Sequence, residues 1–270
     1  MMKRVRLDSE LVRRGLARSR EQAGQLIEAG RVSVGGRVAG KAATQVDTAA
    51  AIVVAETQEG PDYVSRGAHK LLGALRAFDG LQVEGRRCLD AGASTGGFTD
   101  VLLRHGAAHV LAVDVGYGQL AWPLRNDERV TVMERQNVRE LTPELVGEPP
   151  SLVVGDLSFI SLRLVLPALV ACAADVAEFA MLVKPQFEVG KERVGAGGVV
   201  RDPALRAEVV RDVATAARGL GLVVKGVTAS PLPGPSGNVE YVLWLGKGPG
   251  HAEVPDIDDA VRRAVAEGPQ

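Results

Sequence analysis

From residue 86 onward, short apolar segments alternate with longer segments of helical composition, and this alternation constrains the fold more than any other feature. It predicts a largely parallel β-sheet with helices packed on both faces. The expected strands are RCLDAG, HVLAVDV, RVTVME, SLVVGDL, FAMLVKP, GLVVKGVTAS and EYVLWLG. The connection between the last two, PLPGPSGN, is too short for a helical crossover, so we expect the final strand to return antiparallel beside its predecessor.

A glycine-rich turn, LDAGASTGGFTD, follows the first of these strands. Its glycines, at positions 92, 96 and 97, let the backbone approach a ligand closely before a helix that begins near Phe98. The dinucleotide fingerprint Gly-x-Gly-x-x-Gly is not matched, because position 94 is serine and Asp90 precedes the first glycine. An acid here would repel a diphosphate, but it suits a cationic ligand such as S-adenosylmethionine, which carries an ammonium and a sulfonium.

Two further strand ends supply polar groups for such a cofactor. Asp114, in AVDVG, would accept hydrogen bonds from ribose hydroxyls, and Asn137, in ERQNV, could meet the adenine edge. Each feature is common by itself, and their order along the chain is what favours a cofactor site. The expected cofactor-binding set is Asp90, Gly92, Ala93, Ser94, Thr95, Gly96, Gly97, Phe98, Asp114, Val115 and Asn137.

A lysine, Lys184, ends the fifth strand in LVKPQFEVGKE, where burial of its charge is costly unless a partner holds it. Asp156 ends the fourth strand, Glu240 opens the last one, and Lys70 lies in a helix just before the first. Because the strand ends of a doubly wound sheet face one crevice, we expect these four side chains to converge beside the methyl group of the cofactor. The alternative interpretation is a pair of structural salt bridges.

This set of side chains suits methylation of a hydroxyl group. A ribose hydroxyl is a poor nucleophile, and its proton must leave during or before attack on a methyl sulfonium. A lysine serves as a base only when its pKa is lowered, which burial and neighbouring positive charge favour. The end of the fourth strand, GDLSF, lacks the Asn/Asp-Pro-Pro-aromatic motif of amino-group methyltransferases and the nucleophilic cysteine that carbon methylation of pyrimidines needs.

The first 41 residues are basic, with ten Lys or Arg against four Asp or Glu, whereas the remainder holds 22 against 29. A basic segment on an acidic body indicates contact with a polyanion, although a solvated helix face without a ligand is the alternative. The pattern predicts two helices, the second capped at Ser19, then a hairpin at Gly35–Gly36 and a strand in AAIVVAE. The candidate RNA-binding residues are Arg4, Arg6, Arg14, Arg18, Arg20, Lys41 and Arg66.

The sequence gives no sign of a metal centre or a membrane segment. Cys88, Cys172 and the four histidines have no metal-ligand spacing. The N-terminus becomes charged at once, and the longest apolar run, LVLPALVACAA, is too short to span a bilayer. We therefore expect a soluble, cytoplasmic protein that uses no metal ion. The segment GKERVGAGGVVRDP is expected to be either a loop that orders over substrate or a mobile connection.

Long stretches of the chain resemble known families. RLDSELVRRGLARSREQAGQLIEAGRVSVGG is similar to the αL-type RNA-binding module of a small-subunit ribosomal protein, pseudouridine synthases and tyrosyl-tRNA synthetases. YVSRGAHKL, CLDAGASTGGFTDVLL, AVDVGYGQLAW, LVKPQFEVGK and ASPLPGPSGNVEYVLWL resemble the TlyA family, which joins that module to an FtsJ-type methyltransferase domain. The resemblance covers essentially the whole chain.

The resemblance implies an α/β fold of the class I S-adenosylmethionine-dependent methyltransferases, with seven strands and the last antiparallel, after a small α+β RNA-binding domain. The expected limits are residues 1–57 for the RNA-binding domain, 58–63 for a linker and 64–270 for the methyltransferase domain. The family's Lys-Asp-Lys-Glu tetrad falls on Lys70, Asp156, Lys184 and Glu240, and its cofactor loop on Asp90 to Phe98.

The resemblance also implies a reaction, the 2′-O-methylation of cytidine ribose in ribosomal RNA within ribosomal subunits. The long basic N-terminus goes with the branch of the family that methylates both subunits, and such methylation sensitises ribosomes to capreomycin-type antibiotics. We expect a monomer. The alternatives are a membrane-active hemolysin, after an old family label, a catalytically inert RNA-binding or assembly protein, and methylation of a base nitrogen.

Overall fold

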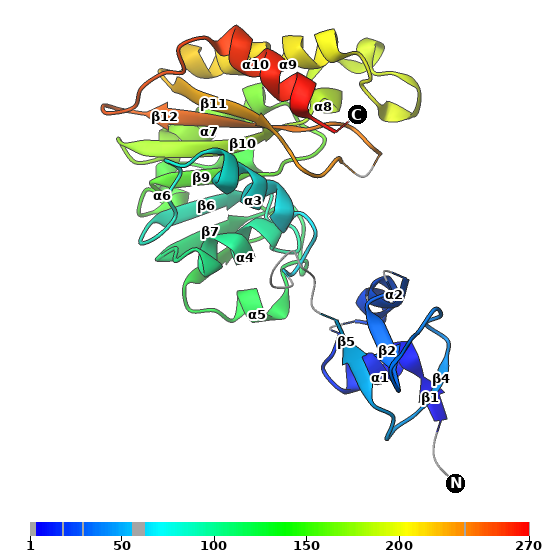
Figure 1. Ribbon diagram of the computed structural model, residues 1–270. Coiled ribbons are helices and arrows are strands. Elements are labelled where there is room, and N and C mark those ends of the chain that lie inside the picture. Colours follow the sequence, from blue (N-terminus) through cyan, green and yellow to red (C-terminus); the bar gives the residue numbers. More distant parts are fainter. Residues whose placement is uncertain (1–3, 18, 29, 56–62, 235, 270) are drawn as a thin grey trace. The chain divides into compact units, whose positions relative to one another are not determined.

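The computed structural model describes residues 4–17, 19–28, 30–55, 63–234 and 236–269. The chain forms two compact units, Met1–Asp62 and Tyr63–Gln270 (Figure 1). The expected limits of the domains and of the linker at 58–63 remain predictions, because residues 56–62 lie outside the described part of the chain.

The smaller unit packs two helices against short strands around one apolar core. Its elements are β1 (Arg4–Arg6), α1 (Leu7–Arg13), α2 (Arg20–Glu28), β2 (Val32–Val34), β3 (Arg37–Val38), β4 (Gln45–Asp47) and β5 (Ile52–Val54). β2 lies between β3 and β5 in one sheet, and β1 pairs with β4 in a second, antiparallel one. Leu7 and Leu11 of α1 meet Ala23 and Ile27 of α2 in the core.

The sequence predicted most of this unit. The Ser19 hydroxyl oxygen accepts a hydrogen bond from the Gln22 N–H at 3.1 Å, as the capping pattern required. Gly35 and Gly36 have φ angles of 55° and 80°, so the hairpin turn between β2 and β3 needs their conformational freedom. The pair formed by β1 and β4 was missed, because three-residue strands with charged side chains carry no apolar alternation.

The larger unit is built on a seven-stranded sheet in the order β11-β12-β10-β9-β6-β7-β8. Its strands are β6 (Arg87–Ala91), β7 (His109–Val113), β8 (Val130–Met133), β9 (Leu152–Gly155), β10 (Ala177–Val183), β11 (Val223–Ala229) and β12 (Tyr241–Lys247). Every pairing is parallel except those of β12, which runs antiparallel between β10 and β11. The predicted fold class and the antiparallel final strand are confirmed.

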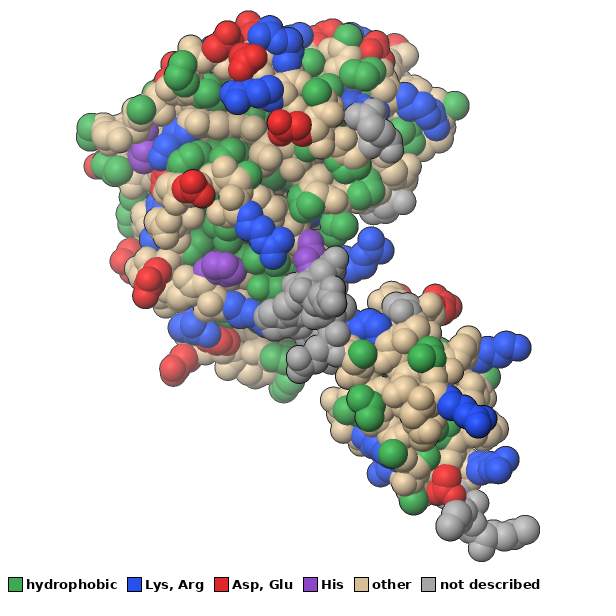
Figure 2. Space-filling view, viewed as in Figure 1, with side chains coloured by type: hydrophobic (Ala, Val, Ile, Leu, Met, Phe, Trp, Pro, Cys, Tyr) green, Lys and Arg blue, Asp and Glu red, His purple; other side chains and the backbone are tan. Residues whose placement is uncertain are grey.

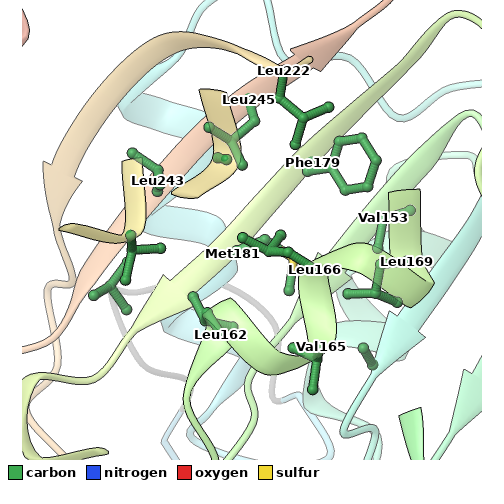
Figure 3. Packing of buried hydrophobic residues seen from close by; sticks show 14 of the residues in the cluster. Val153, Leu162, Val165, Leu166, Leu169, Phe179, Met181, Leu222, Leu243 and Leu245 are labelled. Carbon is green, nitrogen blue, oxygen red and sulfur yellow. The ribbon is translucent and has the colours of Figure 1, made fainter. Parts of the chain in front are cut away.

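Helices cover both faces of this sheet, and adjacent strand residues point into different cores. The helices are α3 (Ala68–Ala77), α4 (Gly97–Arg104), α5 (Trp122–Arg125), α6 (Pro143–Val146), α7 (Leu162–Cys172), α8 (Pro185–Glu188), α9 (Pro203–Gly219) and α10 (Ile257–Glu267), with 3-10 turns η1 (Val138–Glu140), η2 (Lys191–Arg193) and η3 (Ala196–Gly198). Phe179 and Met181 of β10 share one core with Leu162 and Leu166 of α7 (Figure 3). The opposite face packs against α3 and α4.

None of the helices in the described residues combines the length and the apolar character that crossing a membrane requires. The segment after α8, GKERVGAGGVVRDP, was expected to be either a loop that orders over substrate or a mobile connection. Its valines form a small apolar cluster with residues of the neighbouring chain. Val194 and Val200 contact Val189 and Val209, and the Asn238 side chain binds both the Val200 N–H and the Gly198 carbonyl, at 2.9 and 2.8 Å. This segment is therefore attached to the chain that leads into β12.

Candidate active site

Four charged side chains meet at the edge of the sheet where the parallel strands end. Asp156 follows β9, Lys184 follows β10 and Lys70 comes from α3. Glu240 directly precedes β12, and because this strand runs antiparallel its first residue lies at the same edge. The fold therefore brings together the four residues that the sequence singled out.

The four side chains form a ladder of alternating charge. The Lys184 Nζ lies 2.6 Å from Asp156 Oδ1, and the Lys70 Nζ lies 3.3 Å from Asp156 Oδ2. The Lys70 Nζ also donates to Glu240 Oε2 at 2.6 Å. Lys70, Lys184 and Glu240 are buried, at 8%, 6% and 0% exposure, whereas Asp156 is partly open to solvent. Asp156 is therefore the most exposed of the four side chains, at 20%.

Two residues beside this ladder were missed by sequence reasoning. Ser158 accepts a hydrogen bond from the Lys184 Nζ at 2.8 Å. Phe159 is 90% exposed with a φ of 64°, a conformation that is strained for a side-chain-bearing residue, and its ring lies 5.1 Å from that of Phe187. The only sequence signal was their position directly after Asp156 in GDLSF. An exposed ring there can stack on an unpaired base.

The glycine-rich turn lies beneath the ladder. Gly92 and Gly96 have φ angles of 84° and 99°. A Cβ at Gly92 would lie 2.9 Å from the Asp156 carbonyl oxygen, and one at Gly96 would lie 2.3 Å from a methyl group of Leu124. These glycines are therefore required by close packing under the site as well as by backbone conformation.

Asp90 lies behind this turn with no exposed surface. Its Oδ2 accepts a hydrogen bond from the Thr99 hydroxyl at 2.7 Å, and its Oδ1 has no partner in the described residues. Burial raises the pKa of Asp90 to about 7, opposed by the Thr99 hydrogen bond and reinforced by the charges of Asp156 and Asp114. A cation placed at this carboxyl group would supply the missing partner.

A small hollow opens beside Asp114, lined by Ala93, Ser94, Ala112, Asp114, Gly116, Gln119, Leu120, Val132 and Glu134. The Asp114 carboxylate accepts the N–H groups of Ser94 and Gly116, both at 2.7 Å. Glu134, which the sequence analysis did not include, accepts the Gly118 N–H at 2.8 Å and also binds Arg125. Its sequence signal was its place after the third strand of the sheet, the same kind of position as that of Asp114.

Other members of the expected cofactor set lie elsewhere or have other partners. Val115 is 67% exposed outside the hollow, and Phe98, on α4, is buried in the apolar core. The Asn137 side chain accepts the Arg139 N–H at 3.1 Å and so caps η1. A contact between Asn137 and the adenine of a cofactor remains a prediction.

The predicted RNA-binding residues differ in their surroundings. Arg4, Arg6, Arg20 and Lys41 are exposed on the smaller unit, and Arg66 is exposed on the larger one. Arg14 binds Glu10 and the carbonyls of Thr48 and Ala50, so the fold itself uses its guanidinium. Arg18 lies outside the described residues. On the visible face of the smaller unit, Lys and Arg side chains are spread widely and acidic ones are sparse (Figure 2).

Within the described residues, no group of three or more His, Cys, Asp or Glu side chains is placed to hold a metal ion.

Two family models match separate parts of the chain. One, described as FtsJ-like methyltransferase, matches residues 63–247, and the other, the S4 domain, matches residues 5–52. A Mycobacterium tuberculosis protein named 16S/23S rRNA (cytidine-2′-O)-methyltransferase TlyA is 62% identical over 271 residues, which cover all of both chains. The chain belongs to the TlyA family. The family resemblance, the small α+β module and the methyltransferase class inferred from the sequence are thus confirmed.

Relatives within or near the TlyA family carry two kinds of name. A Campylobacter jejuni protein named 23S rRNA (cytidine-2′-O)-methyltransferase TlyA is 38% identical over 67% of this chain and 70% of its own. Hemolysin A of Brachyspira hyodysenteriae is 40% identical over 88% of this chain and 98% of its own. A solved structure described as a putative hemolysin from Streptococcus thermophilus is 41% identical, with a TM-score of 0.75 and coverage of 99% and 98%.

Proposed function

We propose that the protein transfers a methyl group from S-adenosylmethionine to the 2′-oxygen of cytidine in ribosomal RNA, acting on both ribosomal subunits in the cytoplasm as a monomer. The observation that carries the proposal is the buried ladder of Lys70, Asp156, Lys184 and Glu240 directly above the cofactor turn. The dual target is supported by the full-length relative whose name includes both 16S and 23S rRNA.

The residues at the turn fit the proposed cofactor. The Oδ1 of Asp90, which has no partner within the described part of the chain, would accept the cofactor's ammonium, and the remaining lone pairs of Asp114 would accept ribose hydroxyls. Ala93 and Leu120 line the hollow with apolar surface for the adenine. When bound there, S-adenosylmethionine supplies an electrophilic methyl group on a sulfonium.

The ladder would prepare the 2′-hydroxyl for attack. Asp156, the most exposed member of the ladder, and Ser158 together hold the Lys184 Nζ in one position, where it would meet the substrate hydroxyl. Lys184 either accepts the hydroxyl proton as a base or donates a hydrogen bond that directs the oxygen lone pair toward the methyl group. Lys70, held by Glu240, fixes the second oxygen of Asp156. Lys70 and Glu240 therefore position the residues that touch substrate.

The first experiment combines tritiated S-adenosylmethionine with separate, unmodified small and large subunits, followed by reverse transcription at low nucleotide concentration. The proposal expects label in both subunits and a stop at a cytidine in each. Alkaline hydrolysis then identifies the methylated atom, because a 2′-O-methyl group protects the adjacent phosphodiester and a base methyl does not. Label in one subunit alone would restrict the target, and a hydrolysable linkage would overturn ribose methylation.

Two variants at one position test the role of the ladder. Lys184→Ala should abolish methylation and retain subunit binding, whereas a catalytically inert binding protein would keep all its cellular roles in this variant. Lys184→Arg keeps the positive charge, but a guanidinium stays protonated at neutral pH and does not act as a base. Residual activity of this variant would therefore favour orientation of the hydroxyl by a hydrogen bond over base catalysis. Cells lacking active protein should also be less sensitive to capreomycin. Leakage from vesicles exposed to the purified protein would instead support the hemolysin alternative.

A further inference from the structure

Two acidic side chains are buried within the basic smaller unit, and one of them joins arginines from different elements. Asp8, near the start of α1, is 4% exposed. Its carboxylate accepts hydrogen bonds from Nε and Nη2 of Arg6 at 3.0 and 2.8 Å, and from Nη2 and Nε of Arg20 at 2.9 and 3.3 Å. Arg6 ends β1 and Arg20 begins α2, so a single acid aligns two segments.

Both guanidiniums remain open on their outer sides. The side chains of Arg6 and Arg20 are 44% and 59% exposed, while that of Asp8 is 5% exposed. A guanidinium has five N–H donors, and the contacts with Asp8 occupy one edge of each group. Each arginine therefore keeps donors that point away from the carboxylate and can bind a phosphate oxygen.

The carboxylate stays charged at any pH at which a ribosome is intact. Hydrogen bonds from Arg6, and then from Arg20, hold the pKa of Asp8 far below its ordinary value although burial opposes them. An ionised acid at an RNA-binding face weakens the attraction for phosphate, so charge alone does not explain its place there. The place of Asp8 is explained if its carboxylate orients the side chains of Arg6 and Arg20.

Glu10, the second buried acid, serves a different purpose. It accepts hydrogen bonds from Arg13 and Arg14, and Arg14 also donates to the carbonyls of Thr48 and Ala50. The Arg14 side chain is only 22% exposed, so its donors are used within the fold. Glu10 therefore ties α1 to the turn before β5, whereas Asp8 holds two groups that face solvent.

We propose that Asp8 is a positioning residue that holds Arg6 and Arg20 as a preformed receptor for the phosphate backbone of ribosomal RNA. This inference rests on the proposed function, because it assumes that the smaller unit binds that RNA. Two long side chains fixed in advance lose less conformational freedom on binding. This gain outweighs the repulsion between one buried carboxylate and the phosphates.

The test compares two variants of the full-length chain that each remove one negative charge. Asp8→Asn keeps an oxygen that can accept the Ser9 N–H, as Asp8 Oδ1 does at 2.8 Å, but weakens the hold on both arginines. Glu21→Gln removes an exposed acid next to Arg20 that binds no arginine among the described residues. Simple electrostatics predicts tighter binding of isolated ribosomal subunits by both variants. Positioning predicts about tenfold weaker binding for Asp8→Asn and no loss for Glu21→Gln.

Further measurements separate positioning from damage to the fold. In Asp8→Asn the KM for subunits should rise with kcat unchanged, and the slope of log affinity against log salt should stay as in the wild type, since no phosphate contact is removed. Arg6→Ala should instead reduce that slope by roughly one unit. In an Arg6→Ala/Arg20→Ala background Asp8→Asn should not weaken binding further and should tighten it slightly, because only the repulsion of the carboxylate is removed, whereas a misfolding variant would weaken binding again.

The outcomes distinguish this inference from the proposed function. Wild-type protein that binds neither subunit would overturn the proposed function and the inference with it. Wild-type binding together with equal or tighter binding by Asp8→Asn would overturn the inference alone. An additional loss in the double-arginine background would also overturn it, by showing that Asp8 acts through the fold.

Discussion

The ion pair between Lys70 and Glu240 makes a quantitative prediction about stability. Glu240 has no exposed surface, and the only hydrogen-bond partner of its carboxylate among the described residues is the Lys70 Nζ at 2.6 Å. Lys70→Met leaves this carboxylate buried without a cation, which should lower the free energy of unfolding by roughly 3–5 kcal/mol. Adding Glu240→Gln removes the uncompensated charge, so the double variant should recover most of that loss. Neither variant should methylate RNA.

The chain offers a convenient assay for this comparison. Its two tryptophans, Trp122 and Trp244, both lie in the larger unit, and the Trp244 ring stacks on Phe78 with centroids 5.1 Å apart. Tryptophan fluorescence in a urea titration therefore reports unfolding of the unit that carries the site. Unfolding free energies of the single and double variants are measured at pH 7 beside the wild type.

A single variant within about 0.5 kcal/mol of the wild type would refute the reasoning, because it would mean that the Glu240 carboxylate is not buried against a required cation. A double variant less stable than the single one would also refute it. The expected pattern, recovered stability without recovered activity, would show that the ladder is maintained for its chemistry. The alternative of two purely structural salt bridges predicts the opposite, since stability would then depend on both charges.

Four further predictions concern the turn and the segment after α8. Burial raises the pKa of Asp90 to about 7 and a bound ammonium favours its ionised form, so S-adenosylmethionine should bind about tenfold more weakly at pH 6 than at pH 8 by calorimetry. In the free protein the folded-state pKa exceeds the ordinary value of 3.8, so the Asp90 contribution to stability falls as pH rises from about 4 to 7. Asn238→Ala leaves the buried Val200 N–H unpaired and should cost about 1–3 kcal/mol in urea unfolding. Gly96→Ala places a methyl group against Leu124 at a φ of 99° and should abolish cofactor binding.

The predictions for cofactor binding, for Asn238→Ala and for Gly96→Ala each have a contradicting result. Asp90→Asn should bind the cofactor weakly and without pH dependence between pH 6 and 8, so a preserved pH dependence in that variant would assign the effect to another group. Unchanged stability of Asn238→Ala would mean that the segment is not held by its side chain. Normal cofactor affinity of Gly96→Ala would show that Leu124 moves aside and that the turn tolerates a side chain.

The sequence was sufficient to locate the ladder because strand ends in a doubly wound sheet are geometrically linked. Asp156 and Lys184 each follow an apolar run, so the topology alone places them on one edge. Glu240 could be placed only once the last strand was taken as antiparallel, and the short PLPGPSGN connection allowed that inference. Because burying charge at such positions destabilises the fold, charged residues there indicated a functional site.

What the sequence could not supply was the partner of each polar group. Ser158 could not be assigned to the site from the sequence, because its contact with Lys184 depends on the path of the backbone after β9. Arg14 looked like any other basic residue, yet the carbonyls that bind it are 34 and 36 residues away along the chain. Asn137 follows the third strand at a position typical of adenine contacts, and in the structure its side chain caps the start of η1. Local pattern predicts position along an element, whereas contacts depend on the fold.

The placement of β12 has a consequence for how the protein is made. This strand lies between β10 and β11, so a chain that ends before residue 240 cannot join β11 to the rest of the sheet. Such a chain also lacks Glu240. Termination before residue 240 should therefore yield an open, inactive sheet with two unpaired strand edges, which favours aggregation and degradation. The active site is thus completed only after every other strand of the sheet has been synthesised.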